Sequence, residues 1–139
     1  MADAITTNVM QNGFRNAVIR LTNFSDGTGE TNVKKFDATS TGAFGVTRAG
    51  STLYPGIHTK IWGMDYDVQD MKIRLQWEAT VNQDILALGG TPESFDWRSI
   101  GGLTVPPGLA GATGSILLST FQMMPASTYS IVLKIWKDV

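Results

Sequence analysis

The chain has 139 residues, of which 42% are hydrophobic and 17% are charged, and its formal net charge is −1. Its length fits one domain with a sizeable core, and its composition suits neither a disordered chain nor a membrane span. Its small net charge gives no reason to expect a nucleic-acid or membrane partner. The 16 Thr and 15 Gly favour strands and turns, and the absence of Cys excludes disulfides, so the composition predicts an all-β fold with many loops.

The N-terminal segment mixes Ile5 and Val9 with Thr and Asn residues. This pattern predicts either an edge strand or an extended arm over residues 1–12. The segment lacks the basic and apolar regions of a secretory signal, so we expect the chain to be made and folded in a cytoplasm.

The next segment, residues 14–24, places Ala17, Ile19 and Leu21 on one face of a predicted strand. A Gly-rich turn follows it. We therefore interpret residues 31–38 as the second arm of a hairpin with this strand, with a bulge or an edge position to explain their imperfect alternation.

The clearest pattern in the chain covers residues 71–80, where odd-numbered residues are apolar and even-numbered residues are polar. Such a period of two predicts a strand with one face on a core and one face in water. Residues 57–68 alternate in the same way, and Gln69 with Asp70 forms a short link, so residues 57–80 are predicted to be a hairpin. One face of its first strand is expected to carry His58, Lys60, Trp62, Met64, Tyr66 and Val68.

Further strands are predicted at residues 85–88, 115–121 and 128–136, whereas the Gly- and Pro-containing segments 39–56 and 91–114 predict two long loops. The total is about eight strands with no helical stripe, no repeat and no linker. The sequence thus predicts a single all-β domain over residues 1–139, an antiparallel β-sandwich that is jelly-roll-like.

Residues that could support catalysis or metal binding form no complete motif. His58 is the only histidine and no Gly-x-Ser-x-Gly occurs, so neither a Ser-His-Asp system nor a His/Cys metal cluster is supported. Residues 65–70 begin like a calcium loop, but Asp70 and Gln76 stand where Gly and Glu are required. The carboxylates that could form a glycosidase pair also fit surface turns: Glu78 with Asp84, and Glu93 with Asp96. We expect no enzyme activity and no cofactor.

Four tryptophans remain to be explained. Trp77 lies on the apolar face of the strand at residues 71–80 and is expected in the core. Exposed Trp62, Trp97 or Trp136 could stack on a sugar ring or form a protein interface. In a chain with few charges and aromatic residues close to Pro, we favour the interface.

Five segments of the sequence are distinctive together: residues 1–7 (Met-Ala-Asp-Ala-Ile-Thr-Thr), 23–30 (Asn-Phe-Ser-Asp-Gly-Thr-Gly-Glu), 64–77, 95–102 and 128–136. In these segments the chain resembles a family of small virion proteins of tailed bacteriophages. The likeness spans most of the chain but includes no catalytic motif. It implies a decoration or cement protein on the capsid exterior, a β-sandwich that self-associates as a dimer or trimer and bridges copies of the major capsid protein.

The expected location is therefore the capsid surface of a virion assembled in a bacterial host. A tail or head–tail connector protein and a carbohydrate-binding module are the alternatives. The residues expected to make contacts lie in the N-terminal segment and in the second loop: Ile5, Val9, Met10, Phe95, Trp97, Pro106 and Pro107.

Overall fold

The computed structural model describes residues 3–12, 16–37, 59–90, 92–106 and 108–137. Apart from turns and one short 3₁₀ segment, η2 (Arg98–Ile100), these residues form strands, as predicted. The ten strands are β1 (Ala4–Asn12), β2 (Asn16–Asp26), β3 (Val33–Phe36), β4 (Thr59–Gln69), β5 (Lys72–Trp77), β6 (Gln83–Gly89), β7 (Glu93–Asp96), β8 (Leu103–Thr104), β9 (Ile116–Phe121) and β10 (Pro125–Lys137).

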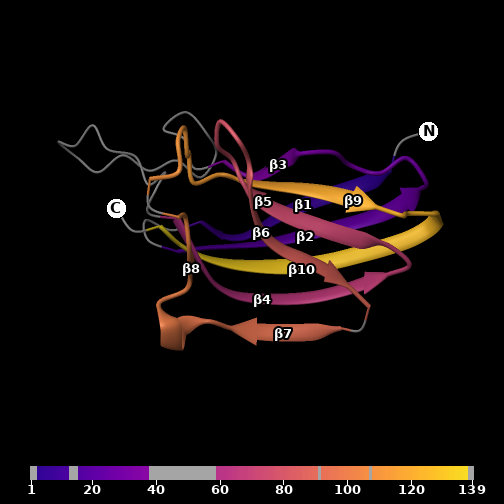
Figure 1. The fold of residues 1–139 in the computed structure, drawn as a ribbon. Helices are drawn as coiled ribbons and strands as arrows, with labels where there is room; N and C mark the ends of the chain where they lie inside the picture. The colour runs from indigo at the N-terminus through magenta and orange to yellow at the C-terminus, as the bar shows by residue number, and fades with distance from the viewer. Residues whose placement is uncertain (1–2, 13–15, 38–58, 91, 107, 138–139) are drawn as a thin grey trace.

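The strands form two antiparallel sheets of unequal width (Figure 1). The six-stranded sheet has the order β1-β2-β10-β4-β7, with β8 also paired to β4, and the four-stranded sheet has the order β3-β9-β5-β6. Strands that are far apart in the chain are therefore neighbours, most clearly β2 and β10.

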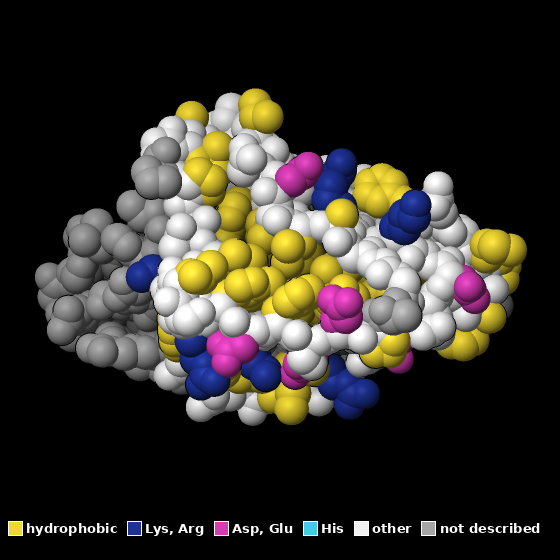
Figure 2. Space-filling view, turned by 60° about the horizontal axis from the view of Figure 1, so that its bottom comes forward, with side chains coloured by type: hydrophobic (Ala, Val, Ile, Leu, Met, Phe, Trp, Pro, Cys, Tyr) yellow, Lys and Arg dark blue, Asp and Glu magenta, His cyan; other side chains and the backbone are white. Residues whose placement is uncertain are grey.

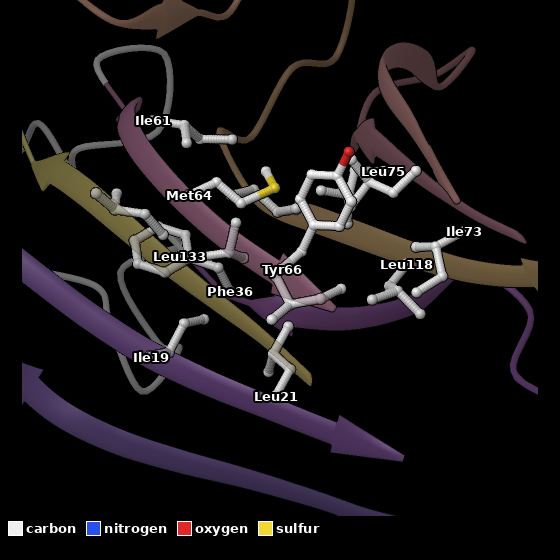
Figure 3. Close-up of a cluster of buried hydrophobic side chains, with 14 of the residues drawn as sticks. Ile19, Leu21, Phe36, Ile61, Met64, Tyr66, Ile73, Leu75, Leu118 and Leu133 are labelled. Carbon is white, nitrogen blue, oxygen red and sulfur yellow. The ribbon is translucent and has the colours of Figure 1, made fainter. Parts of the chain in front are cut away.

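The predicted alternation places the core correctly in three strands. Every second residue is buried in β2 (Ala17 to Leu21), in β5 with the residue before it (Met71 to Trp77) and in β10 (Tyr129 to Ile135). These side chains meet in one hydrophobic cluster to which both sheets contribute, as Figure 3 shows for Ile19 and Leu133 of one sheet and Ile73 and Leu118 of the other. Burial of each large aliphatic side chain contributes roughly 1.5–3 kcal/mol, so this cluster is the main source of stability.

The predicted hairpin over residues 57–80 is wrong, because β4 and β5 belong to different sheets. The link contains Asp70, whose φ of 59° reverses the chain, and the hydroxyl of Ser127 donates to the Asp70 carbonyl at 2.9 Å. The chain thus crosses from one sheet to the other, and the apolar faces of β4 and β5 oppose each other across the core. Alternation identifies the buried face of a strand but does not identify its neighbour.

A bulge in β4 changes which of its side chains point inward, so the predicted division of its residues between two faces is wrong in part. Residues Gly63 and Ile61 lie opposite the consecutive residues Lys134 and Ile135 of β10, so Trp62 is the extra residue. The inward direction therefore changes at this point: Ile61 is buried as well as Met64, and Trp62 is only half-buried. An added Cβ at Gly63 would lie 3.0 Å from Cδ of Lys134 and 3.3 Å from the backbone oxygen of Phe95, so a larger residue there would require these neighbours to shift slightly.

Two other expectations change. Residues 31–38 do not form a hairpin with β2, because β3 pairs with β9 in the smaller sheet. The second predicted loop contains β7, η2 and β8, and both strands add to β4. The first predicted loop, residues 39–56, lies outside the described residues, as do His58 and Pro107.

Candidate interaction surfaces

The side chains considered for catalysis are engaged in local contacts. Glu78 accepts from Thr113 at 3.0 Å and pairs with Lys34 at 3.1 Å, and Asp84 accepts from Gln76 at 2.7 Å. Among the described residues, no three His, Asp or Glu side chains are placed to hold a metal ion. Glu78 and Asp84 are therefore each held by neighbouring side chains.

The carboxylates of β7 are held in the same way. Arg98 donates two hydrogen bonds to Asp96 through Nε and a third at 2.6 Å through Nη2, and these bonds lower the pKa of Asp96 to about 2. A carboxyl group with that pKa is ionised at neutral pH and cannot serve as a general acid. Glu93 accepts a long hydrogen bond of 3.4 Å from the hydroxyl of Tyr66.

The first candidate surface is the N-terminal edge, which we define as residues 4–11 of β1. β1 is the last strand of the six-stranded sheet and pairs only with β2 among the described strands. All of its residues from 4 to 11 are exposed, including Ile5 (44%), Val9 (47%) and Met10 (59%). The structure thus makes this segment an edge strand, and the contact role of the three predicted residues stays a prediction.

One set of side chains of the N-terminal edge lies on the core side of the sheet. Ile5, Thr7 and Val9 lie opposite Asn23, Leu21 and Ile19 of β2, and cross-strand partners share a face. Because these partners are buried, Ile5 and Val9 lie on the core side of the sheet. Their exposure means that the second sheet does not reach far enough to cover them.

A buried polar network holds the start of this edge strand in place. Asp3 accepts hydrogen bonds from Asn23 (3.0 Å), from the hydroxyl of Ser25 (3.0 Å) and from the backbone N–H of Asp26 (3.1 Å). Burial alone would raise the pKa of Asp3, but these bonds and one from the backbone of Gly29 outweigh it and lower the pKa to about 2. The residue before β1 is thereby fixed to β2.

The same network continues to Glu30, which joins the two sheets. Its carboxylate accepts from Asn23 at 3.2 Å and from the hydroxyl of Tyr129 at 2.6 Å, and it forms an ion pair with Lys35. Its backbone N–H donates to the Thr120 hydroxyl of β9 at 2.8 Å. The Glu30 and Lys35 side chains are only 1% and 3% exposed, and burial followed by the bond to Glu30 raises the pKa of Tyr129.

Sequence reasoning missed this network. Its residues are polar and lie beside turns, where Asp, Glu and Lys are usually solvated. Only Tyr129 carried a signal, since alternation places it on the buried face, and a buried tyrosine hydroxyl requires a partner.

The second candidate surface is the aromatic edge, which we define as the partly buried apolar residues of β6, β7 and the segment that follows. Phe95 stacks on Trp97 with ring centroids 5.1 Å apart and on Tyr66 at 5.9 Å. β6 and β7 are the end strands of their sheets, and the face seen from the β7 side has apolar side chains across its middle, flanked by charges of both signs (Figure 2). The members of this edge are Ile85, Leu86, Phe95, Trp97 and Leu103.

The structure therefore separates the predicted contact residues. Phe95 and Trp97 lie at one end of the six-stranded sheet, whereas Ile5, Val9 and Met10 lie at the other end. Pro106 is half-buried, and its carbonyl accepts from the backbone N–H of Leu109 at 3.3 Å. The two groups cannot form one patch.

An aromatic and cationic cluster on the outer face of the six-stranded sheet was not predicted as a unit. Trp62 stacks on Trp136 at 5.9 Å, with the guanidinium of Arg98 5.2 Å and the ammonium of Lys134 5.5 Å from its ring. Nε1 of Trp62 is buried without a hydrogen-bond partner among the described residues. The bulge at Trp62 brings this ring outward, so the cluster could not be recognised before the register was known.

Beside this cluster lies an open groove of about 400 Å³ between β4, β7 and β10, lined in part by Asp65, Asp67 and Glu93. A hydrogen bond with Ser94 and then contact with Lys134, 3.2 Å away, lower the pKa of Asp65. Burial and then Glu93 raise the pKa of Tyr66. The groove is thus anionic at neutral pH and partly balanced by the lysine.

No family model, curated protein sequence or solved structure matches this chain. Within the described residues there is also no helix of the length and hydrophobicity needed to cross a membrane.

The charge on Asp3 is predicted to stabilise the N-terminal edge. Its folded-state pKa lies below the ordinary 3.8, so the ionised form contributes stability above about pH 4, and this contribution is lost as the pH falls toward 2. We expect Asp3→Asn to lower the free energy of unfolding at pH 7 by about 1–2 kcal/mol and to weaken its acid dependence between pH 4 and 2. Urea unfolding at several pH values measures the free energy of unfolding and its acid dependence. Asp67→Asn, at an exposed position, is the control, and an unchanged acid profile in Asp3→Asn would contradict the assignment.

The buried pair of Glu30 and Lys35 gives a second prediction. Lys35→Met leaves the buried carboxylate of Glu30 without its counter-charge and is expected to cost about 3–5 kcal/mol. Combining it with Glu30→Gln removes that charge and should recover a substantial part of the loss. Urea unfolding of both single variants and the double variant gives the coupling energy, and additive losses would show that the two groups do not interact.

Proposed function

We propose that this chain is a non-catalytic structural protein of a bacteriophage virion. In this role it binds the outside of the capsid as a decoration or cement protein and bridges copies of the major capsid protein. The proposal rests on the resemblance of five sequence segments to such proteins and on the surfaces described above.

One observation carries the proposal: the six-stranded sheet ends in two different apolar edges at its opposite sides. A protein that bridges neighbours must make at least two contacts that point in different directions. The N-terminal edge offers aliphatic side chains and a row of backbone groups that no other described strand pairs with, and the aromatic edge offers stacked rings beside charges. Aromatic residues in such settings are typical anchors of protein interfaces.

We also infer that the two sheets form a β-sandwich of jelly-roll type. With β1 and β8 set aside, eight strands remain, and we count them from first to eighth along the chain. Their order is first-eighth-third-sixth in one sheet and second-seventh-fourth-fifth in the other. This pair of orders supports a jelly roll. Viral capsid proteins often use this fold, which is compatible with a virion role but supports it only by analogy.

Binding to the assembled capsid provides the mechanism of stabilisation. A protein that binds the closed shell and not the free subunits shifts the equilibrium toward the shell by mass action. The shell gains about 2.7 kcal/mol per site when the free concentration is 100 times the dissociation constant. This activity needs complementary surfaces and no reactive group.

The two alternatives predict different partners. A tail or head–tail connector protein would use the same edges at another position in the particle. A carbohydrate-binding module would need a free aromatic face, but the ring of Trp62 is already engaged by Trp136 and two cations, and Phe95 and Trp97 stack on each other.

The proposal predicts that the purified protein binds saturably to phage capsids assembled without it and raises the temperature at which they open. Trp97→Ala removes an anchor of the aromatic edge and is expected to weaken binding at least about tenfold. Co-sedimentation with capsids measures occupancy, and thermal unfolding verifies that the variant is folded. Phe121→Ala, an exposed aromatic position of β9, is the matched control and should bind like the unmodified chain.

If the protein fails to bind capsids but binds isolated tails or glycans, the corresponding alternative replaces this proposal. Electron microscopy of particles carrying the protein gives its position directly.

A further inference from the structure

From Ala4 to Val9, the outer side of β1 has none of the usual features that prevent edge strands from pairing. β1 has nine residues, it contains no charged residue and no proline, and residues 4–11 are exposed. Natural sheets commonly protect such edges with Lys, Pro, short strands or bulges. The only irregularity here falls between Val9 and Gln11, so the stretch from Ala4 to Val9 is a regular edge whose outer backbone groups are paired with no other described strand.

The sequence of this stretch is complementary to itself in one antiparallel register. If two copies are centred on Thr7, Ile5 lies opposite Val9 in both halves, Thr6 lies opposite Asn8, and Thr7 lies opposite Thr7 of the other copy. Aliphatic side chains then meet aliphatic ones and polar side chains meet polar ones. Centring on Asn8 instead places Ile5 opposite Gln11, and centring on Thr6 places Ile5 opposite Thr7.

The two-fold axis of this register also fits the direction of the side chains. Residues directly opposite each other share a face, so Ile5, Thr7 and Val9 of both copies remain on the core side of the joined sheet. The four aliphatic side chains then cover one another at the place where the four-stranded sheet leaves them exposed. No like charges come together, since β1 has none.

We propose that two copies of this chain form a homodimer by antiparallel pairing of β1 with β1 across a two-fold axis at Thr7, which joins the two six-stranded sheets into one. This inference deepens the self-association that belongs to the proposed function and identifies its surface and register. The dimer would carry an aromatic edge at each far end, so one particle could contact two partner molecules. The contact is short, and its strength depends on concentration.

Because the chain contains no cysteine, a single introduced thiol tests the register. Thr7→Cys places two thiols opposite each other at the axis, within the distance that a disulfide requires, and mild oxidation should produce a covalent dimer. Thr6→Cys is the matched control on the same exposed strand. In this register, position 6 lies opposite Asn8 of the other copy, and the two copies of position 6 are too far apart for a disulfide. Thr6→Cys should therefore cross-link far less.

A charge variant tests the same pairing without a covalent bond. Thr7→Lys brings like charges together at the axis and should raise the dimer dissociation constant at least about tenfold in sedimentation velocity. Thr31→Lys adds the same charge at an exposed position outside β1 and should dimerise normally. An equimolar mixture of Thr7→Lys and Thr7→Glu should restore the dimer, which a variant that merely fails to fold could not do.

A monomeric unmodified protein at high concentration, or equal cross-linking of Thr7→Cys and Thr6→Cys, would overturn this inference. Capsid binding is measured separately. Saturable capsid binding by a monomer would support the proposed function and reject the dimer. A dimer that binds no capsid would support the dimer and reject the proposed function.

Discussion

The unequal width of the two sheets is the constraint on which the surface properties of this protein depend. Six strands face four, and β1, with its aliphatic residues on the core side, extends past the cover that the smaller sheet provides. In a soluble protein, a sheet face that is neither covered nor polar tends to become an interface. The exposure of Ile5 and Val9 is therefore a consequence of the architecture and is not an accident of composition.

The buried network around Glu30 makes such an edge tolerable. An edge strand paired on one side only would fray if its start were free, but Asp3 accepts three hydrogen bonds from β2. Glu30 continues the same network to β10 through Tyr129 and to β9 through Thr120, so the strand is tied indirectly to both sheets. Burial of these charges is costly, and it is offset only because each carboxylate has several partners. The network thus fixes the start of the N-terminal edge to both sheets.

The sequence was sufficient to predict the all-β class and the buried faces of β2, β5 and β10, but it did not predict which strands are neighbours. Alternation in β2, β5 and β10 reports which side chains point inward, and this depends only on the local pleat. Pairing depends on contacts between distant segments, which explains why the apparent hairpin at residues 57–80 proved to be a crossover between sheets. The bulge at Trp62 could not be recognised either, because it is defined relative to β10. The contact role of the predicted residues stays a prediction, and the sequence could not indicate that Ile5, Val9 and Met10 lie at one end of a sheet and Phe95 and Trp97 at the other.

The separation of the two edges limits what kind of assembly this chain can form. The aromatic edge packs partly on its own core through Phe95 and Trp97 and carries charged neighbours, so it suits a partner with a different surface. The N-terminal edge is uncharged and complementary to itself, so it suits a second copy. If the aromatic edge bound copies of itself as well, the chain would form a closed tetramer where the two two-fold axes meet at right angles and an open filament in other arrangements. Under the proposed function, the N-terminal edge pairs with itself and the aromatic edge recognises a different molecule, and this division of roles would make the dimer a two-fold bridge between identical partners.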